Sequence, residues 1–289
     1  MSVAVIGATS KTGRYLVARL LADGRDVVAV GRDLERLAAL DGIARTVVAD
    51  LSQPETVRTA LAGAHQVVSL AHARFTASLL GALPDDCRRV VLTGSTRRFT
   101  QLPDPAADEV RAGEAAFTAS GRPGVMLHPG LIYGSPDERN VNRILRYAAR
   151  WPKGGPVPFP LPAGGRATIQ PVFVDDLVDA FVGALTRDEA PGPPIVVGGP
   201  APIAYRDFVA ACARAMGRRA VILPLPVGIV AALGACARPL GLRSAPNRAE
   251  LRRMTEDKAF DMTPLRERLG VVPRSFEAGL ALKLERGWV

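Results

Sequence analysis

Residues 3–13 read VAVIGATSKTG, and the helical pattern RYLVARLL follows over residues 14–21. An apolar strand, a glycine turn and a helix in this order begin a βαβ unit of the kind that binds a dinucleotide pyrophosphate. Gly7 permits the tight turn, and Gly13 lets the helix pack closely on the strand. The N–H groups at the helix start would face the phosphates. Residues 7–13 therefore form the predicted phosphate loop.

The first half of the chain continues this alternation of short apolar runs and helical patterns. Strands are predicted at Val3–Ile6, Val27–Val30, Thr46–Ala49, Val67–Ala71, Val90–Thr93, Val125–His128 and Ile195–Val197. Helices are predicted at Thr12–Asp23, Leu34–Leu40, Pro54–Ala62 and Phe75–Leu83. Strands that are apolar throughout and alternate with helices are typical of a parallel sheet covered on both faces. The fold class is therefore α/β, a doubly wound parallel sheet.

The second half is less regular and predicts a smaller substrate lobe. Residues 1–133 form the expected dinucleotide-binding core, and residues 134–289 form the lobe, within one integrated unit. Trp151–Gly165 holds five Pro and four Gly, which predicts a loop. A Pro-rich linker then leads to an uncharged segment that ends at Ala237. At 17 residues from Val221 this segment is too short to span a bilayer, and we expect a buried helix from about Val227.

Composition excludes several classes of protein. Of 37 basic residues 33 are Arg, and they stand singly or in pairs, mostly beside acids, so the net charge of +9 does not indicate a nucleic-acid surface. The three Cys residues lie far apart with no His at ligand spacing, which argues against a disulfide framework and a metal site. The scattered Cys residues fit a reducing, cytoplasmic location. The apolar fraction of 48% is ordinary for a folded globular protein.

The phosphate loop resembles the GATGxTG loop of extended and atypical short-chain dehydrogenase/reductases, with Ser10 at the middle glycine. A side chain there either crowds the pyrophosphate or bonds to it through its hydroxyl. The resemblance also places an acid and an apolar residue around the adenine, and an LA stretch at the nicotinamide ribose. The expected cofactor-binding residues are Gly7, Thr9, Ser10, Lys11, Thr12, Gly13, Arg32, Asp50, Leu51, Ala71, His72 and Pro129. Ser52 and Glu55 have the spacing of a helix capping box, so Asp50 and Leu51 have a structural reading as well.

The end of the second strand indicates which nicotinamide cofactor is bound. An NAD site places an acid at this strand tip, to hold the ribose 2′-hydroxyl. Here Gly31 is followed by Arg32, whose guanidinium suits the 2′-phosphate of NADP(H). Lys11 and Arg14 add positive charge. NADP(H) is therefore favoured over NAD, and the alternative reading is that Arg32 is one surface arginine among many.

The catalytic pair of short-chain reductases is missing. These enzymes use a Tyr and a Lys four residues apart on one helix to exchange a proton with the substrate. Four residues after the only tyrosines, Tyr15, Tyr133, Tyr147 and Tyr205, stand Arg19, Asp137, Trp151 and Val209. Aligning RAGEAA at residues 111–116 with related proteins puts Ala106 at the Tyr position and Val110 at the Lys position. Neither side chain can move a proton.

Other motifs resemble the atypical branch of the family, which includes an NAD(P)-binding accessory subunit of respiratory complex I and epimerase-like proteins. HPGLIYG at residues 128–134 resembles RPxxxYG with His replacing Arg, and PVFVDDL at residues 171–177 resembles PVxVxDxA. Polar groups that could act near the nicotinamide are Ser95, Thr96, His72, His128 and Tyr133. For His128 a structural role at a strand end is the alternative, and for Tyr133 packing within the small lobe.

Two functions follow from these observations. The first is an NAD(P)-dependent oxidoreductase, or a nucleotide-sugar epimerase-like enzyme, that acts on a small molecule without the Tyr/Lys pair. The second is a non-catalytic dinucleotide-binding protein that serves as a scaffold, redox sensor or respiratory-complex accessory factor. A protein partner or homo-oligomer would dock on the small lobe or on the helix near residue 230.

Overall fold

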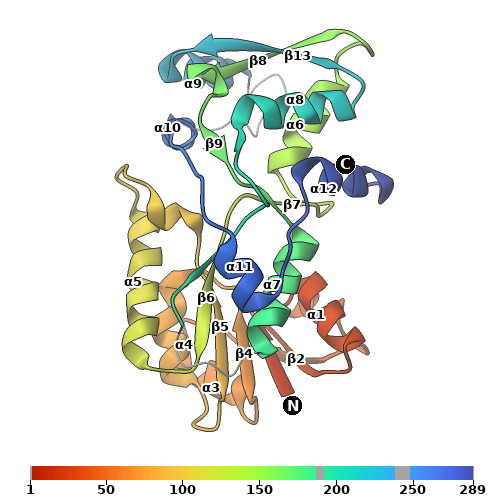
Figure 1. The fold of residues 1–289 in the computed structure, drawn as a ribbon. Helices are drawn as coiled ribbons and strands as arrows, with labels where there is room; N and C mark the ends of the chain where they lie inside the picture. Colours follow the sequence, from red (N-terminus) through yellow and green to blue (C-terminus); the bar gives the residue numbers. More distant parts are fainter. Residues whose placement is uncertain (1, 187–191, 238–247, 289) are drawn as a thin grey trace. The chain divides into compact units, whose positions relative to one another are not determined.

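Seven parallel strands, six from the first half of the chain and one from the second, form one sheet (Figure 1). They are β1 (Ser2–Ile6), β2 (Asp26–Gly31), β3 (Arg45–Val48), β4 (Gln66–Ser69), β5 (Arg89–Thr93), β6 (Gly124–Pro129) and β11 (Ile195–Val197). Their order in the sheet is β11-β6-β5-β4-β1-β2-β3. The predicted doubly wound sheet is confirmed, with every predicted strand present.

The computed structural model describes residues 2–186, 192–237 and 248–288. The chain folds as two compact units. The first contains the chain up to Gly130 together with Val174–Val197 and Asp261–Val272. The second contains Leu131–Phe173, Gly198–Phe260 and the chain from Pro273 onward.

Helices cover both faces of the sheet in the first unit. On one face α1 (Gly13–Ala22) packs against α7 (Val174–Thr186). On the other, α3 (Pro54–Leu61), α4 (Thr76–Ala82) and α5 (Pro105–Ser120) follow one another. The first unit also holds the short helices α2 (Leu34–Ala38), α11 (Thr263–Leu269), η1 (Ala73–Phe75) and η2 (Thr96–Phe99). Because both faces are covered, Val3, Ala4 and Val5 are all fully buried, which explains why β1 is apolar at every position.

The strand order reverses direction between β1 and β4. From β1 the chain adds β2 and β3 on one side, and it then returns to add β4, β5 and β6 on the other. The carboxyl ends of β1 and β4 lie side by side at this reversal, and in open α/β sheets such a reversal is where ligands bind. This reversal places the phosphate loop and the segment after Ser69 at one location.

The second unit is built from short sheets and helices. Its two-stranded sheets pair β8 (Pro156–Pro162) with β13 (Arg219–Leu225), β7 (Ile132–Tyr133) with β10 (Val172–Phe173), and β9 (Thr168–Ile169) with β12 (Ile203–Ala204). Its helices are α6 (Asn140–Ala149), α8 (Tyr205–Ala215), α9 (Val227–Ala237), α10 (Arg248–Arg253) and α12 (Phe276–Glu285), with the short η3 (Ala163–Gly165). The helix predicted from about Val227 is present as α9.

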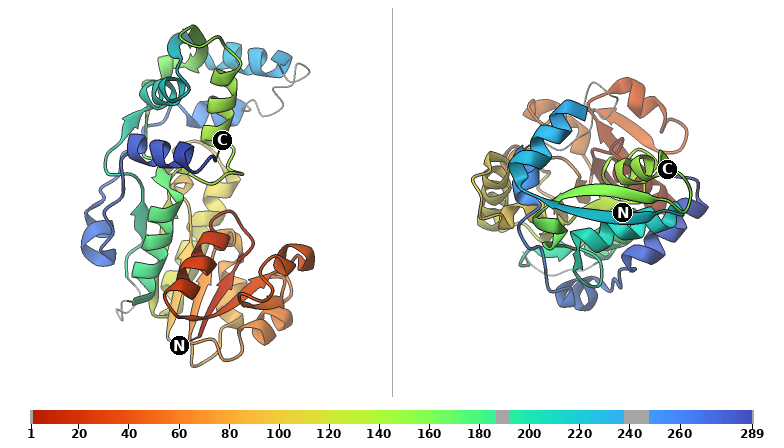
Figure 2. Two further views of the ribbon diagram at one scale, coloured as in Figure 1. Left: turned by 90° about the vertical axis from the view of Figure 1, so that its right-hand side faces the viewer. Right: turned by 90° about the horizontal axis from the view of Figure 1, so that it is seen from above.

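The predicted loop at residues 151–165 and the linker before α9 are wrong, because both contain a strand. Residues Pro156–Pro162 pair in parallel with Arg219–Leu225, and the two strands lie side by side in Figure 2. Every second residue of β8 is proline, and alternate residues of a strand direct their N–H groups to the same side. Proline is tolerated on the outer side of an edge strand, where no partner needs an N–H group. Val157, Phe159 and Leu161 between the prolines are buried.

The expected buried helix at residue 227 forms, but its described side chains are mostly not buried. Val230 is buried, whereas Ile229 is 48% exposed. Leu223 in the neighbouring strand is also exposed. In the described ranges no helix is long and apolar enough to cross a membrane. Cys87 and Cys212 are free and buried, and the side chain of Cys236 lies outside the described residues.

A buried ion pair joins α12 to the start of α6 within the second unit. Lys283 is fully buried, with its Nζ 3.0 Å from the carbonyl oxygen of Ser135 and 3.5 Å from Oε1 of Glu138. Glu138 also accepts hydrogen bonds from the N–H groups of Val141 and Asn142, at 3.0 and 2.9 Å. Burial lowers the pKa of Lys283, and the charge of Glu138 opposes that change. The carboxylate therefore both caps α6 and neutralises the lysine.

Candidate dinucleotide and active site

The phosphate loop has the geometry that its glycines predict. Gly7 has a φ of +79°, which favours glycine, and its N–H donates to the carbonyl of Val30 at 2.9 Å. A Cβ on Gly13 would lie 2.2 Å from the carbonyl oxygen of Gly7 and 2.7 Å from that of Ala8. Both oxygens belong to the backbone, so they cannot move away by a change of rotamer as a side chain could. Only glycine permits this close approach of α1 to the loop, so the cradle fits a dinucleotide pyrophosphate.

The side chain of Ser10 is used inside the loop. Its hydroxyl accepts a hydrogen bond from the N–H of Gly13 at 3.0 Å. This contact satisfies one of the N–H groups at the start of α1, in the manner of a capping residue. Thr9 is half-buried and Thr12 is buried, whereas Lys11 in the loop and Arg14 on the first turn of α1 are exposed. The loop therefore presents positive charge beside its backbone cradle.

Arg32 and Asp50 lie at the ends of the neighbouring strands β2 and β3. Arg32 is exposed and follows Gly31, whose carbonyl accepts the N–H of Ala49. The N–H and hydroxyl of Ser52 both donate to Oδ1 of Asp50, at 2.8 Å each. These hydrogen bonds, with a smaller contribution from Arg32, lower the pKa of Asp50.

The structural reading of this segment, a capping box of Ser52 and Glu55, is wrong. Helix α3 begins after Gln53, and no side chain caps it. Ser52 instead bonds to Asp50, so the carboxylate is held in place at the strand end. Leu51 packs at the margin of the core below α3 and α4. Asp50 and Leu51 lie at the carboxyl end of β3, and their role beside the adenine stays a prediction.

The segment after β4 lies directly against the phosphate loop. The Cβ of Leu70 and the N of Ala71 would lie 3.4 and 3.8 Å from a Cβ on Gly7. His72 follows, half-exposed, and its Nδ1 accepts a hydrogen bond from the N–H of Arg74 at 3.3 Å. The same nitrogen lies 3.4 Å from Oε2 of Glu109 on α5. His72 is thus a solvent-accessible titratable group at the reversal point of the sheet.

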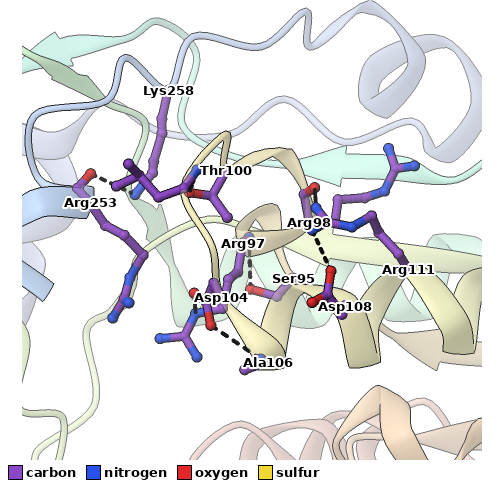
Figure 3. Close-up of polar contacts among 11 residues, drawn as sticks. Ser95, Arg97, Arg98, Thr100, Asp104, Ala106, Asp108, Arg111, Arg253 and Lys258 are labelled. Carbon is purple, nitrogen blue, oxygen red and sulfur yellow. Dashed lines mark hydrogen bonds and ion pairs between the residues drawn. The ribbon is translucent and has the colours of Figure 1, made fainter. Parts of the chain in front are cut away.

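Ser95 and Thr96 follow β5 at the same edge of the sheet. The N–H of Ser95 donates to Nδ1 of His128 at 2.9 Å, and its hydroxyl accepts the N–H of Arg97 at 3.1 Å. Thr96 is buried, with its Oγ1 3.3 Å from the carbonyl oxygen of Pro129. Figure 3 shows Ser95 beside Arg97, with Arg97 reaching Asp104 at the start of α5. Ser95 is half-buried and held on two sides, so it is the better placed of the two hydroxyls to meet a ligand.

His128 is fully buried and forms part of a charged cluster. Its Nδ1 accepts from Ser95, so Nε2 carries the hydrogen of the neutral ring and faces Oε2 of Glu114 at 3.0 Å. The Nε of Arg98 lies 2.7 Å from the same oxygen. Burial, with a smaller contribution from the charge of Arg98, lowers the pKa of His128 to about 4. Burial also raises the pKa of Glu114.

This arrangement supports the structural reading of His128. A ring that is neutral at pH 7 and has no exposed surface holds the Ser95 backbone in place, and it is poorly suited to donate a proton to a substrate. Arg98 supplies the cation next to Glu114. Sequence reasoning missed Arg98 and Glu109. The available signal was their position: Arg98 follows the Ser/Thr site by two residues, and Glu109 lies on α5 between Ala106 and Val110.

Tyr133 belongs to the second unit and is fully buried there. Its hydroxyl donates to the carbonyl oxygen of Phe276 at 3.2 Å, and its ring packs against Phe173 and Phe276 with centroids 5.3 and 5.0 Å apart. These contacts support the reading of Tyr133 as a packed residue of the small lobe. Ala106 is half-buried and Val110 is buried on α5. The two positions of the family's proton relay are therefore occupied by groups without a proton to transfer.

The buried His128 predicts a pH dependence of stability. The unfolded chain binds this proton below about pH 6.5 and the folded chain only below about pH 4. The free energy of unfolding should therefore fall by about 3 kcal/mol as the pH drops from 6.5 to 4. Glu114, whose pKa is raised, acts in the opposite direction near its usual range. Urea unfolding of the parent and His128→Gln at several pH values isolates the histidine, and equal pH dependence in both would contradict the prediction.

Comparisons with known proteins agree with this geometry. A family model described as NAD(P)H-binding matches residues 7–120. An uncharacterized protein of Mycobacterium tuberculosis is 28% identical over 284 residues, which cover 94% of this chain. The chain spans only 28% of the length of that relative. The 3-diazoavenalumate denitrifying reductase of a Streptomyces species is 30% identical over 236 residues, which cover 66% of this chain and 74% of the reductase.

Solved structures share the fold at lower sequence identity. The triphenylmethane reductase of a Citrobacter species superposes with a TM-score of 0.77 at 19% identity, covering 99% of this chain and 100% of the other. The UDP-glucose 4-epimerase of Thermotoga maritima, solved with UDP-glucose, gives 0.74 at 16% identity, covering 99% and 98%. The family-model match and the 30% identical reductase, of which this chain covers 74%, show that the chain belongs to the NAD(P)H-binding family.

Proposed function

We propose that the protein is an NADP(H)-dependent oxidoreductase that reduces a carbonyl group of a small molecule without the family's Tyr/Lys pair. The observation that carries this proposal is the phosphate cradle at the reversal point of the sheet, with Ser95 and His72 at the ends of the neighbouring strands. In this fold the same edge positions the nicotinamide and the substrate. Bound there, the reduced dinucleotide supplies hydride. The chain's own residues bind it, orient the carbonyl and provide a proton.

The preference for NADP(H) rests on Arg32. Its exposed guanidinium follows β2, and Asp50 at the end of β3 is held by Ser52. A charge-assisted hydrogen bond to a phosphate contributes about 1.5–3 kcal/mol. We expect Arg32→Ala to weaken NADPH binding at least about tenfold and to change NADH binding less than about twofold. Fluorescence titration measures both, with Arg36→Ala on the exposed α2 as the matched control. Tighter binding of NADH than NADPH by the parent would exclude this preference.

The reaction itself is tested by NADPH oxidation with 4-nitrobenzaldehyde and 9,10-phenanthrenequinone as probes. Ser95 is the candidate to hydrogen-bond the carbonyl oxygen, because its hydroxyl lies at the end of β5 and is only half-buried. Ser95→Ala should lower kcat while leaving NADPH binding intact. An epimerase-like activity is the other chemistry of this fold, and conversion of a nucleotide sugar with no net cofactor consumption would reveal it.

A non-catalytic role is the second candidate. Ala106 and Val110 leave the usual relay positions empty, and the second unit exposes the apolar side chains of Leu223 and Ile229. A scaffold or accessory factor would retain its dinucleotide tightly, turn over no substrate and bind a protein through such a surface. Robust reduction of either probe would exclude this role. A stable complex isolated from the native host, with no turnover, would favour it.

A further inference from the structure

The proposed reduction requires a proton for the substrate oxygen, and the first unit offers few groups that could deliver one. The chain has three histidines. His128 is fully buried and already bonded to the Ser95 backbone. His65 precedes β4 and contacts Ser2, so it lies at the opposite, amino-terminal edge of the parallel sheet. His72 is the histidine at the carboxyl edge.

His72 lies beside the phosphate loop on grounds independent of the family. Leu70 donates its N–H to the carbonyl of Ile6 at 2.9 Å, and Leu70 and Ala71 flank Gly7. His72 is the next residue, where the strand order reverses. Ligands of open α/β sheets bind at such a reversal, so His72 lies at the edge where a ligand is expected. The side chain of His72 is 43% exposed, so it can exchange protons with solvent.

Glu109 faces His72 from the helix that carries the emptied relay positions. Its Oε2 lies 3.4 Å from Nδ1 of His72, and its side chain is also 43% exposed. Helix α5 is held close to this segment at Gly113, where a Cβ would lie 2.4 Å from the carbonyl oxygen of Ala73. Backbone packing of α5 on η1 therefore keeps the two residues near each other. Glu109 stands one helical turn after Ala106 and directly before Val110.

We propose that His72 and Glu109 form the acid–base pair of this enzyme, replacing the missing Tyr and Lys. This proposal rests on the proposed reductase function. In the neutral ring Nδ1 of His72 accepts the N–H of Arg74. In the protonated ring Nδ1 carries a hydrogen that faces Oε2 of Glu109, and Nε2 is the nitrogen that transfers its proton. A carboxylate beside the ring stabilises the imidazolium that donates it. His72 is the catalytic residue, and Glu109 is a positioning residue.

The reduction adds one hydride and one proton to the carbonyl group. The carbonyl carbon of the substrate receives hydride from the reduced nicotinamide dinucleotide, and the π-electron pair of the C=O bond moves onto oxygen. That oxygen takes the proton from Nε2 of His72, so the products are an alcohol, the oxidised dinucleotide and a neutral imidazole. The exposed ring then recovers a proton from water. General acid catalysis of this kind contributes about 10²–10⁴-fold to the rate.

The first test determines whether bound NADP⁺ covers His72, and it does not require turnover. Diethyl pyrocarbonate modifies accessible imidazoles, and mass spectrometry identifies the modified residue. We expect saturating NADP⁺ to slow modification of His72 at least about fivefold and to leave His65 unchanged, because His65 lies at the other edge of the sheet. Equal modification of His72 with and without NADP⁺ would overturn the proposal.

The second test separates chemistry from capping. His72→Asn keeps a side-chain acceptor for the N–H of Arg74 but cannot donate as an acid. We expect kcat with 4-nitrobenzaldehyde to fall about 100-fold or more, with KM and the Kd for NADPH within about twofold. Glu109→Gln should lower kcat about tenfold, and Asp108→Asn, one residue away and exposed, should match the parent. Added imidazole should restore part of the activity of His72→Ala.

The possible results separate a failure of the His72–Glu109 pair from a failure of the reductase function. If His72→Asn is as active as the parent, the acid–base pair is wrong while the reductase function stands. If imidazole fails to rescue His72→Ala, His72 acts through structure and the proposal is also overturned. A parent that binds NADPH and reduces neither probe removes the reductase function and the pair together.

Discussion

Gly13→Ala is expected to weaken dinucleotide binding by more than about 100-fold. The added Cβ would lie 2.2 Å from the carbonyl oxygen of Gly7 and 2.8 Å from the carbonyl carbon of Ala8. Helix α1 would have to retreat by about 1 Å to restore ordinary contacts. That displacement misplaces the N–H groups that form the cradle, and overpacking itself costs about 1–3 kcal/mol of stability. Titration with NADPH and urea unfolding measure the two effects.

Gly81→Ala is the matched control for this substitution. Gly81 lies in α4, and nothing stands within 4 Å of a Cβ built on it. Alanine should therefore leave NADPH binding unchanged and stabilise the helix by up to about 1 kcal/mol. If Gly13→Ala bound NADPH as the parent does, the phosphate cradle would have to lie elsewhere. Loss of binding in both variants would point to a general effect of the substitution.

Glu138→Ala is expected to destabilise the protein by about 3–5 kcal/mol. Removing the carboxylate leaves the ammonium group of Lys283 buried without its partner, and breaking a buried pair from one side has this cost. It also removes the acceptor for the N–H groups of Val141 and Asn142 at the start of α6. Both losses act on the second unit. Urea unfolding followed by circular dichroism measures the change in free energy.

A second substitution tests the cause of that loss. Lys283→Met in the Glu138→Ala background removes the stranded charge and keeps the apolar volume, so part of the stability should return. Glu285→Ala, an exposed acid on the same α12, should change stability by less than about 0.5 kcal/mol. A double variant less stable than Glu138→Ala would show that Lys283 stabilises the protein without its acid.

Features that depend on residues close together in the sequence were predictable from the sequence alone. The strands of the sheet follow from apolar runs such as Val27–Val30, and the phosphate loop follows from two glycines after one such run. The proline-rich strand β8 was not predictable in this way, since its partner β13 lies about 60 residues away and alone makes those prolines an edge. Composition suggests a loop, but pairing decides the structure.

The candidate site also contains residues whose positions were predictable from the sequence and contacts that depend on tertiary packing. The positions of Gly7, Gly13 and Arg32 at one edge of the sheet were predictable, because the carboxyl ends of parallel strands meet there. The Arg98–Glu114 and His72–Glu109 contacts depend on how α5 packs against segments 16 and 37 residues earlier in the chain. Side-chain pairs of this kind leave no periodic signal. The loss of the Tyr/Lys pair was visible in the sequence, whereas the pair that we propose in its place required the fold.

The path of the chain limits how this protein can be shortened. The backbone passes between the two units five times, after Gly130, Phe173, Val197, Phe260 and Val272. A fragment ending at Gly130 would lack β11, leaving the ladder of β6 open, and would lack α7, uncovering the apolar face beneath it. An open edge on an uncovered sheet recruits other chains. Fragments that end where the chain passes between the units should therefore aggregate. Expression of residues 1–130 alone, or of residues 131–289 alone, should yield insoluble protein.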